Sequence, residues 1–215
     1  MNLPQVVSQQ EWQQARDALL AKEKAHTKAM DALNAERRRL PMVKIDKEYV
    51  FDGPDGRSTL LELFDGHRQL IIYHVMLYAG DPHRCPGCSM LLDGLPHPAH
   101  LAARSTRLVA VAPATLAEIE EYRARMGWDI PFFSSHGNGF TDDLELGMNY
   151  GISVFLRDGE NVYRTYYTTG RGGDQLNATL PWLDLTPLGR QENWELPQGR
   201  GSDVPSSWWR LHDEY

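Results

Sequence analysis

Apolar residues recur at helical spacing through the first part of the chain. They form one stripe made of Trp12, Ala15, Leu19, His26, Met30 and Leu33. Ser8 and Glu11 have the spacing of a capping box, in which a hydroxyl and a carboxylate satisfy free N–H groups at the start of a helix. Pro41 cannot continue helical geometry. The pattern predicts one long helix from Gln9 to Arg39.

Short apolar runs then alternate with helical patterns. Strands are expected over 70–76, 107–112, 152–156 and 162–167, and a capped helix over 115–126. The run LIIYHVM at 70–76 is typical of a strand that is buried on both faces. Asp158 and Gly159 indicate a hairpin between the last two strands. The order predicts an α/β fold whose central mixed sheet is flanked by helices, with most strands parallel and the hairpin antiparallel.

The chain divides into three parts by composition. We expect a helical arm over 1–40, an α/β domain over 41–185 and a separate segment over 186–215. The last segment is rich in Gly, Pro and Ser, and it contains Trp194, Trp208 and Trp209. Tryptophan side chains are usually at least partly buried. The segment is therefore expected to pack on the domain or on the second subunit of a homodimer.

Composition excludes some classes of function. Apolar residues make up 41% of the chain, which is enough for a core. The formal net charge of −7 makes a nucleic-acid partner unfavourable, because such proteins bind phosphates with basic surfaces. No apolar run has the length of a membrane span, and the N-terminus lacks the pattern of a secretory signal. We therefore expect a cytoplasmic protein with neither a membrane nor a nucleic-acid partner.

The chemistry is concentrated in DPHRCPGCSM, residues 81–90, which holds both cysteines of the chain. Structural disulfides are rare in the cytoplasm, so a close cysteine pair there is more often catalytic, redox-sensing or metal-binding. Cysteine at a helix N-terminus has a lowered pKa, because the free N–H groups favour the thiolate. We assign Cys85 as the attacking thiol and Cys88, one turn further on, as the resolving thiol.

The neighbours of this pair suit the same chemistry. His83 and Arg84 place positive charge beside Cys85, which would lower its pKa further. Pro86 fits the first turn of a helix, where no N–H donor is required. Gly87 leaves the turn free of a side chain. These four are candidate supporting residues.

Two other interpretations of the cysteines stay open. They could be structural residues that happen to be close. They could also bind zinc or copper together with His97 and His100, although eight residues between the second cysteine and the first histidine are fewer than in zinc fingers. His74 lies on the buried strand, where a hydrogen-bonded core histidine is more common than a ligand.

The segments quoted next resemble the DUF899 family of bacterial proteins. They are VVSQQEWQQARDALLAKEKAHTKAMDALNAERRRLP, DKEYVFDGPDG, LIIYHVMLY, CPGCSMLLDGLPH and WWRLHDEY, which together span nearly the whole chain. The resemblance implies a thioredoxin-like fold, and members are sometimes labelled predicted dithiol-disulfide isomerases. It supplies a fold and not a measured activity.

A wider resemblance is to the thioredoxin and peroxiredoxin superfamily. GRSTLLELFDGHRQLIIYHVM, residues 56–76, is similar to the segment of peroxiredoxins that leads to their peroxide-reacting cysteine, which Cys85 would match. Pro82 stands where peroxiredoxins carry Thr or Ser, and the loop 149–152 lacks the proline that thioredoxins use beside their substrate. The resemblance makes Tyr78, Gly151 and Ile152 candidate substrate-binding residues.

Three functions are therefore carried forward. The first is thiol–disulfide exchange at Cys85 and Cys88 with a protein or small-molecule disulfide or thiol, and without an organic cofactor or a metal. The second is peroxiredoxin-like reduction of peroxide at Cys85. The third is a thioredoxin-fold binding or scaffold protein whose cysteines are inert.

Overall fold

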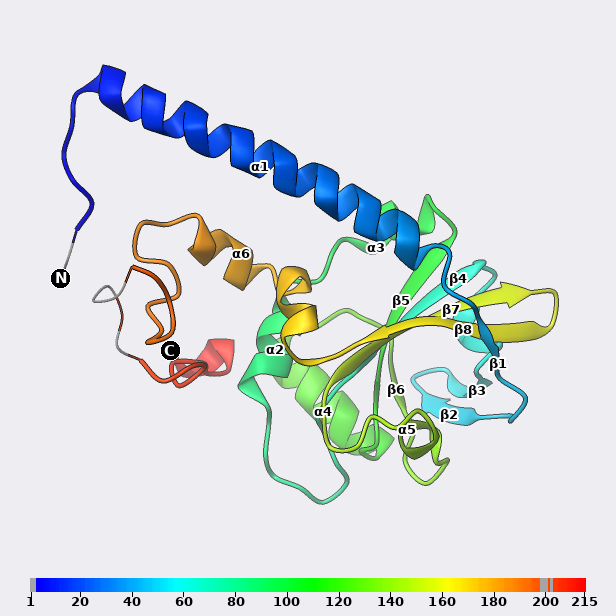
Figure 1. Ribbon diagram of the computed structural model, residues 1–215. Helices are drawn as coiled ribbons and strands as arrows, with labels where there is room; N and C mark the ends of the chain where they lie inside the picture. Colours follow the sequence, from blue (N-terminus) through cyan, green and yellow to red (C-terminus); the bar gives the residue numbers. More distant parts are fainter. Residues whose placement is uncertain (1–2, 198–200, 202) are drawn as a thin grey trace. The chain divides into compact units, whose positions relative to one another are not determined.

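A computed structural model describes residues 3–197, 201 and 203–215 (Figure 1). These residues form two units, Met1–Pro41 and Met42–Tyr215. No helix in the described part of the chain is both long and apolar enough to cross a membrane.

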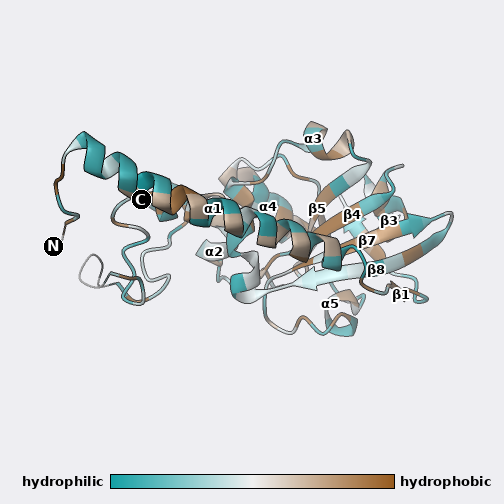
Figure 2. Cartoon of the chain, turned by 45° about the horizontal axis from the view of Figure 1, so that its top comes forward, coloured by the Kyte–Doolittle hydropathy of each residue, from teal (hydrophilic) through white to brown (hydrophobic). Residues whose placement is uncertain are grey.

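The first unit is dominated by α1, Gln9–Arg37. The Ser8 side chain accepts a hydrogen bond from the backbone N–H of Glu11, and the Glu11 carboxylate accepts one from the backbone N–H of Ser8, so the capping box is present as predicted. The helix ends two residues before the predicted Arg39. None of its residues is buried, and Figure 2 shows it largely in hydrophilic colours.

The second unit is built on a single sheet of eight strands. Their order is β1-β8-β7-β4-β5-β6-β2-β3. The strands are β1 (Val43–Lys44), β2 (Val50–Gly53), β3 (Gly56–Thr59), β4 (Gln69–His74), β5 (Thr106–Ala112), β6 (Phe132–Ser134), β7 (Gly151–Asp158) and β8 (Asn161–Thr168). The part β8-β7-β4-β5, with β4 parallel to β5 and antiparallel to β7, is the arrangement of a thioredoxin-like fold.

The expectation of a largely parallel sheet is wrong. The parallel pairings are β4 with β5 and β5 with β6. Every other pairing between the strands is antiparallel. The reason is that hairpins supply both sides of the sheet. One hairpin, β2–β3, turns between Gly53 and Gly56, and the other, β7–β8, turns at Gly159 with a φ of 58°. Tight turns connect only antiparallel strands.

Helices follow the strands along the chain. They are α2 (Pro86–Asp93), α3 (Pro98–Ala102), α4 (Leu116–Met126), α5 (Phe140–Asp143) and α6 (Thr179–Asp184), with the 3₁₀ helices η1 (Glu62–Phe64), η2 (Gly170–Leu176) and η3 (His212–Glu214). Thr115 caps α4, and Glu118 completes a capping box, as the sequence predicts.

Alternation along the central strands separates two apolar clusters. In β4, Leu70 and Ile72 belong to one cluster, whereas Tyr73 belongs to the other, because successive side chains of a strand point to opposite faces. The Tyr73 cluster contains Cys88 of α2 and Tyr122 of α4. Figure 1 shows these two helices next to each other beside the sheet. The cysteine helix therefore lies over the face to which Tyr73 points.

Candidate dithiol site

Cys85 is the N-cap residue of α2. Its backbone is extended, with φ −69° and ψ 113°, and its sulfur accepts a hydrogen bond from the backbone N–H of Cys88 at 3.5 Å. Pro86 occupies the first turn, where its missing N–H costs no hydrogen bond. The Ser89 hydroxyl donates to the Cys85 carbonyl at 3.0 Å. A sulfur at this position faces the free N–H groups of the helix, which favour a negative charge.

The two thiols have pKa values shifted in opposite directions. The hydrogen bond from the Cys88 thiol lowers the pKa of Cys85 to about 6, and backbone N–H groups and the nearby His83 act in the same direction against the effect of burial. Cys88 has a raised pKa, first because its proton is held in that hydrogen bond and then because it is buried. A hydrogen bond from Tyr73 acts in the opposite direction on Cys88.

The two sulfurs also differ in exposure. Cys85 is partly exposed, whereas Cys88 is only 3% exposed and packs in the core cluster. The Tyr73 hydroxyl lies 3.4 Å from the Cys88 carbonyl oxygen, and Tyr73 is itself buried. The outer thiol is therefore the more acidic of the two, and the inner thiol keeps its proton.

The candidate supporting residues before the helix have separate surroundings. His83 is exposed, and its charge contributes to the lowered pKa of Cys85. Arg84 donates to the Asp81 carbonyl at 2.6 Å, and its guanidinium lies over the Tyr122 ring at 5.3 Å from the centroid. Arg84 therefore orders the loop against α4.

A cavity of about 80 Å³ adjoins both cysteines. Its walls come from β4, α2, the loop before β7, the η2–α6 segment and the C-terminal segment. The lining residues are Tyr73, Cys85, Gly87, Cys88, Leu91, Tyr150, Gly173, Asp174, Asn177, Leu180 and Trp209.

The candidate substrate-binding residues lie outside this lining. Gly151 and Ile152 are buried residues of β7, paired with His74 and Tyr73 of β4. The residue of the same loop that lines the cavity is Tyr150. Burial raises the pKa of Tyr78, and the charges of the two nearby cysteines raise it further. Tyr78 is therefore close to the dithiol, but it does not line the cavity.

Trp209 is one of the lining residues, with Tyr73, Tyr150 and Asp174, that sequence reasoning did not place at the site. Its ring lies against the backbone of Gly87, so that a Cβ atom added to Gly87 would come within 2.5 Å of Trp209 Cζ3. The tryptophan content of 186–215 indicated a packed segment, but it did not say on which surface. At position 87, only glycine leaves room for this contact.

The histidines of the metal alternative have other contacts. The His97 ring accepts a hydrogen bond from the backbone N–H of Ala99 and caps α3, and it lies 5.7 Å from the His100 ring. Within the described residues, no group of three or more His, Cys, Asp and Glu side chains could hold a metal ion. His74 is buried, and its Nε2 lies 3.0 Å from the Ser153 hydroxyl.

The strand order and the dithiol at the start of α2 define a thioredoxin-like protein. The chain belongs to the DUF899 family, described as bacterial proteins of unknown function, whose family model matches residues 1–215. No curated protein matches the chain.

Several solved structures are similar in fold. Peroxiredoxin Q of Xanthomonas campestris is 17% identical over 64% of this chain and 90% of its own, with a TM-score of 0.45. A Chlorobium tepidum protein assigned as the thiol:disulfide interchange protein DsbE is 14% identical over 65% of this chain and 93% of its own, with a TM-score of 0.47. An uncharacterised conserved protein of Geobacillus kaustophilus is 13% identical over 58% and 68%, with a TM-score of 0.43. At such identities the function has to be argued from the residues.

Proposed function

We propose that the protein is a thiol–disulfide oxidoreductase in which Cys85 attacks and Cys88 resolves. The observation that carries the proposal is the asymmetry of the pair. Cys85 is partly exposed, accepts hydrogen bonds as a thiolate and has a pKa lowered to about 6. Cys88 is buried and protonated one turn further into the helix. Two cysteines with only a packing role would not require one partly exposed thiol of lowered pKa beside one buried, protonated thiol.

The reaction follows from the asymmetry. The Cys85 thiolate attacks one sulfur of a disulfide R–S–S–R, forms a Cys85–S–S–R bond and releases one thiolate. The Cys88 thiol then loses its proton to the released thiolate, attacks Cys85 and expels the second thiolate. The protein dithiol has lost two electrons, and the substrate leaves as two thiols once a proton from solvent has neutralised the second thiolate. The reverse sequence oxidises thiols with the protein disulfide.

Tyr73 is positioned to assist the second step. Its hydroxyl donates to the Cys88 carbonyl at 3.4 Å, and when it turns its proton toward the sulfur it lowers the pKa of Cys88, which helps the buried thiol to lose its proton. Burial first, and then Cys88, raises the pKa of Tyr73 itself, so its hydroxyl keeps a proton to donate. A donor that stays protonated beside a buried thiolate offsets part of the free energy that burial of the charge costs.

A trapping experiment tests the assignment. With Cys88→Ser, a disulfide substrate should leave one stable adduct on Cys85, which intact mass and peptide mapping would detect. Wild-type protein should release the adduct and form the internal disulfide. The matched variant, Cys85→Ser, keeps only the buried thiol and should react much more slowly. Full reactivity of Cys85→Ser would exclude Cys85 as the attacking thiol.

The same protein distinguishes the peroxide alternative. A peroxidase forms sulfenic acid on the attacking cysteine before any disulfide appears. Reduced wild-type protein would be treated with hydrogen peroxide and with a disulfide in separate reactions. Thiol–disulfide exchange predicts fast oxidation by the disulfide, whereas fast sulfenic acid formation and a slow reaction with disulfides would favour peroxide reduction.

A further inference from the structure

Trp209 covers one side of the dithiol. Ring atoms Cζ3 and Cε3 would lie 2.5 Å and 2.8 Å from a Cβ atom at Gly87, so the indole rests on the backbone between the two cysteines. The same ring lines the cavity beside Cys85. A polypeptide substrate that approached from this side would meet the indole before the sulfur.

Anchors on both sides of Trp209 hold it in place. Leu211 is 3% exposed and belongs to the same core cluster as Cys88. Two nitrogens of Arg125 donate to the Asp213 carboxylate, at 2.8 and 3.0 Å. On the other side, the buried Glu192 carboxylate accepts from the backbone N–H of Ser206 at 2.8 Å. These contacts hold the indole at a fixed position beside the dithiol.

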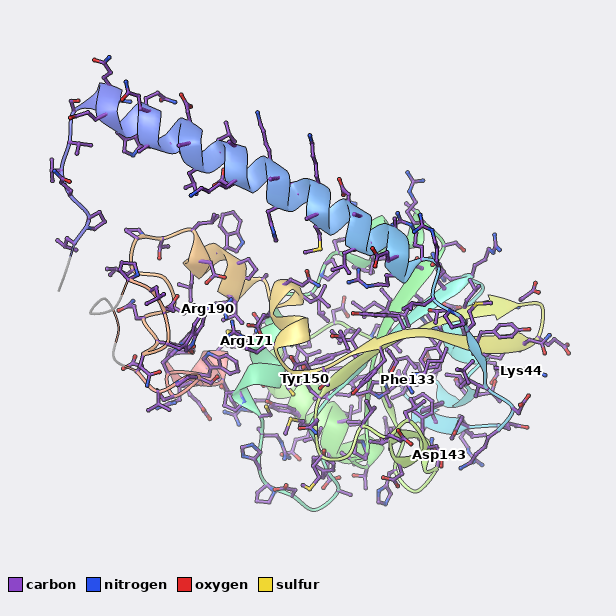
Figure 3. The ribbon with its side chains drawn as sticks, in the orientation of Figure 1. Lys44, Phe133, Asp143, Tyr150, Arg171 and Arg190 are labelled. Carbon is purple, nitrogen blue, oxygen red and sulfur yellow. The ribbon has the colours of Figure 1, made fainter. Side chains whose placement is uncertain are left out.

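The part of the cavity wall that contains Asp174 is held by ion pairs. The Asp174 carboxylate lies 3.2 Å from Arg171 Nε and 3.0 Å from Arg190 Nη1. Arg190 also lies 2.8 Å from Asp184, and its side chain is only 9% exposed. In the view of Figure 3, Arg171 lies between Arg190 and Tyr150. The η2 segment is held in place by the chain's own side chains.

The Tyr150 carbonyl beside the dithiol already accepts a hydrogen bond. The Tyr150 carbonyl accepts a hydrogen bond from the Thr169 hydroxyl, and the Tyr150 hydroxyl donates to the Gly170 carbonyl. Gly151 pairs with His74 in the sheet. A peptide that binds by strand addition needs free backbone groups at an edge. At Tyr150 the chain itself occupies the carbonyl that such a peptide would use.

The space that remains is small. The cavity of about 80 Å³ is roughly half of the 150 Å³ in which a protein cavity holds one benzene molecule. It accommodates the –CH₂–S–S– end of a substrate and no peptide strand. We propose that the dithiol exchanges with low-molecular-weight disulfides and thiols, and that the C-terminal segment around Trp209 excludes disulfides within polypeptides.

This proposal rests on the proposed function and narrows its substrate class. The chemical step is the same two-step thiol–disulfide exchange at Cys85 and Cys88. The reduced dithiol gives two electrons to a small disulfide, which leaves as two thiols, and Cys85 and Cys88 become joined by one S–S bond. A second, different low-molecular-weight thiol then reduces the Cys85–Cys88 disulfide by the reverse sequence and leaves as its own disulfide, so the cycle needs only small thiols and disulfides.

The test compares disulfides of increasing bulk on the reduced, full-length protein. The probes are hydroxyethyl disulfide, oxidised glutathione and a dimeric peptide joined through central cysteines. The loss of alkylatable protein thiols gives the rate of oxidation by each probe. This rate is divided by the rate at which the same probe reacts with a simple thiol in solution, which removes differences in intrinsic reactivity. We expect the normalised rate for the peptide to be about 10- to 100-fold lower than for hydroxyethyl disulfide, which is the order for displacing one partly buried aromatic side chain such as Trp209.

A pair of tryptophan variants tests the cause. Trp209→Ala should raise the normalised peptide rate at least about tenfold and leave the hydroxyethyl disulfide rate within about threefold, if one aromatic side chain sets the barrier. Trp182→Ala removes a tryptophan that is 72% exposed and should change neither rate. If Trp209→Ala does not fold, the wild-type comparison decides alone.

The outcomes separate the two proposals. Equal normalised rates for the peptide and hydroxyethyl disulfide in wild-type protein would overturn the restriction to small substrates and leave thiol–disulfide exchange standing. No reaction with any disulfide would overturn exchange, and the restriction with it. Selectivity for small disulfides that Trp209→Ala leaves unchanged would overturn the role of the indole.

Discussion

The acidity of Cys85 gives the most quantitative expectation. In wild-type protein the thiolate should form with a midpoint near pH 6, against an ordinary cysteine value of 9.0. The perturbation that tests the cause is Cys88→Ala. It removes the thiol hydrogen bond that contributes most to the lowered pKa, so the midpoint for Cys85 should move upward toward 9.

The size of the effect on rate can be worked out from these values. At pH 7 a thiol with a pKa of 6 is about 90% thiolate, whereas one with a pKa of 9.0 is about 1% thiolate. Nucleophilicity falls as the pKa falls, with a Brønsted coefficient of about 0.4–0.5, and three units reduce it about 15- to 30-fold. The net gain is about three- to sixfold. Absolute rate is therefore a weak test, and the midpoint of the pH profile is a strong one.

The assay is iodoacetamide alkylation of reduced protein from pH 4 to 10, with the site read by peptide mass. Cys85→Ala serves as the control, because the remaining thiol, Cys88, is only 3% exposed and its burial still acts to raise its pKa without Cys85, so it should react little below pH 9. A wild-type midpoint at pH 8.5 or above would refute the argument. A midpoint near 6 that Cys88→Ala leaves in place would refute the assigned cause.

Three further expectations concern neighbouring parts of the fold. Gly87→Ala forces the Trp209 ring to move, since the new Cβ would lie 2.5 Å from it. Tryptophan fluorescence should therefore shift to the red, and Cys85 should be alkylated faster. Unchanged spectra and alkylation rates would contradict the contact. Burial, and then Arg164, lowers the pKa of His74 to about 3, below its ordinary 6.5, so the folded state should lose stability as pH falls from 6.5 toward 3, by up to about 1.4 kcal/mol per unit, and His74→Asn should remove that part of the slope in urea unfolding. Thr115→Ala removes the cap of α4 and should lower the free energy of unfolding by about 1 kcal/mol, whereas Thr115→Ser should keep it.

Local patterns account for what the sequence predicted well. Both capping boxes depend on residues three positions apart, and the run at 70–76 shows its burial directly in its composition. The hairpin at Gly159 follows from one turn residue that adopts a positive φ. These features depend on neighbours along the chain, which the sequence displays.

The rest depends on contacts between distant segments. β1 has two exposed residues and carries no apolar pattern that would mark it. The cavity joins Cys88 to Tyr150 and Trp209, which periodicity cannot bring together. The glycine between the cysteines has an ordinary φ, so nothing local shows that an indole requires the space. The cysteine pair could be read from the sequence, whereas the substrate side of the site could not.

Redox titration of the purified full-length protein tests the central claim most directly. The protein would be equilibrated in glutathione and dithiothreitol buffers, alkylated and counted by mass, after a metal assay on the same sample. We expect both thiols to disappear together in one reversible two-electron transition. Two thiols that stay alkylatable at every potential would contradict the account.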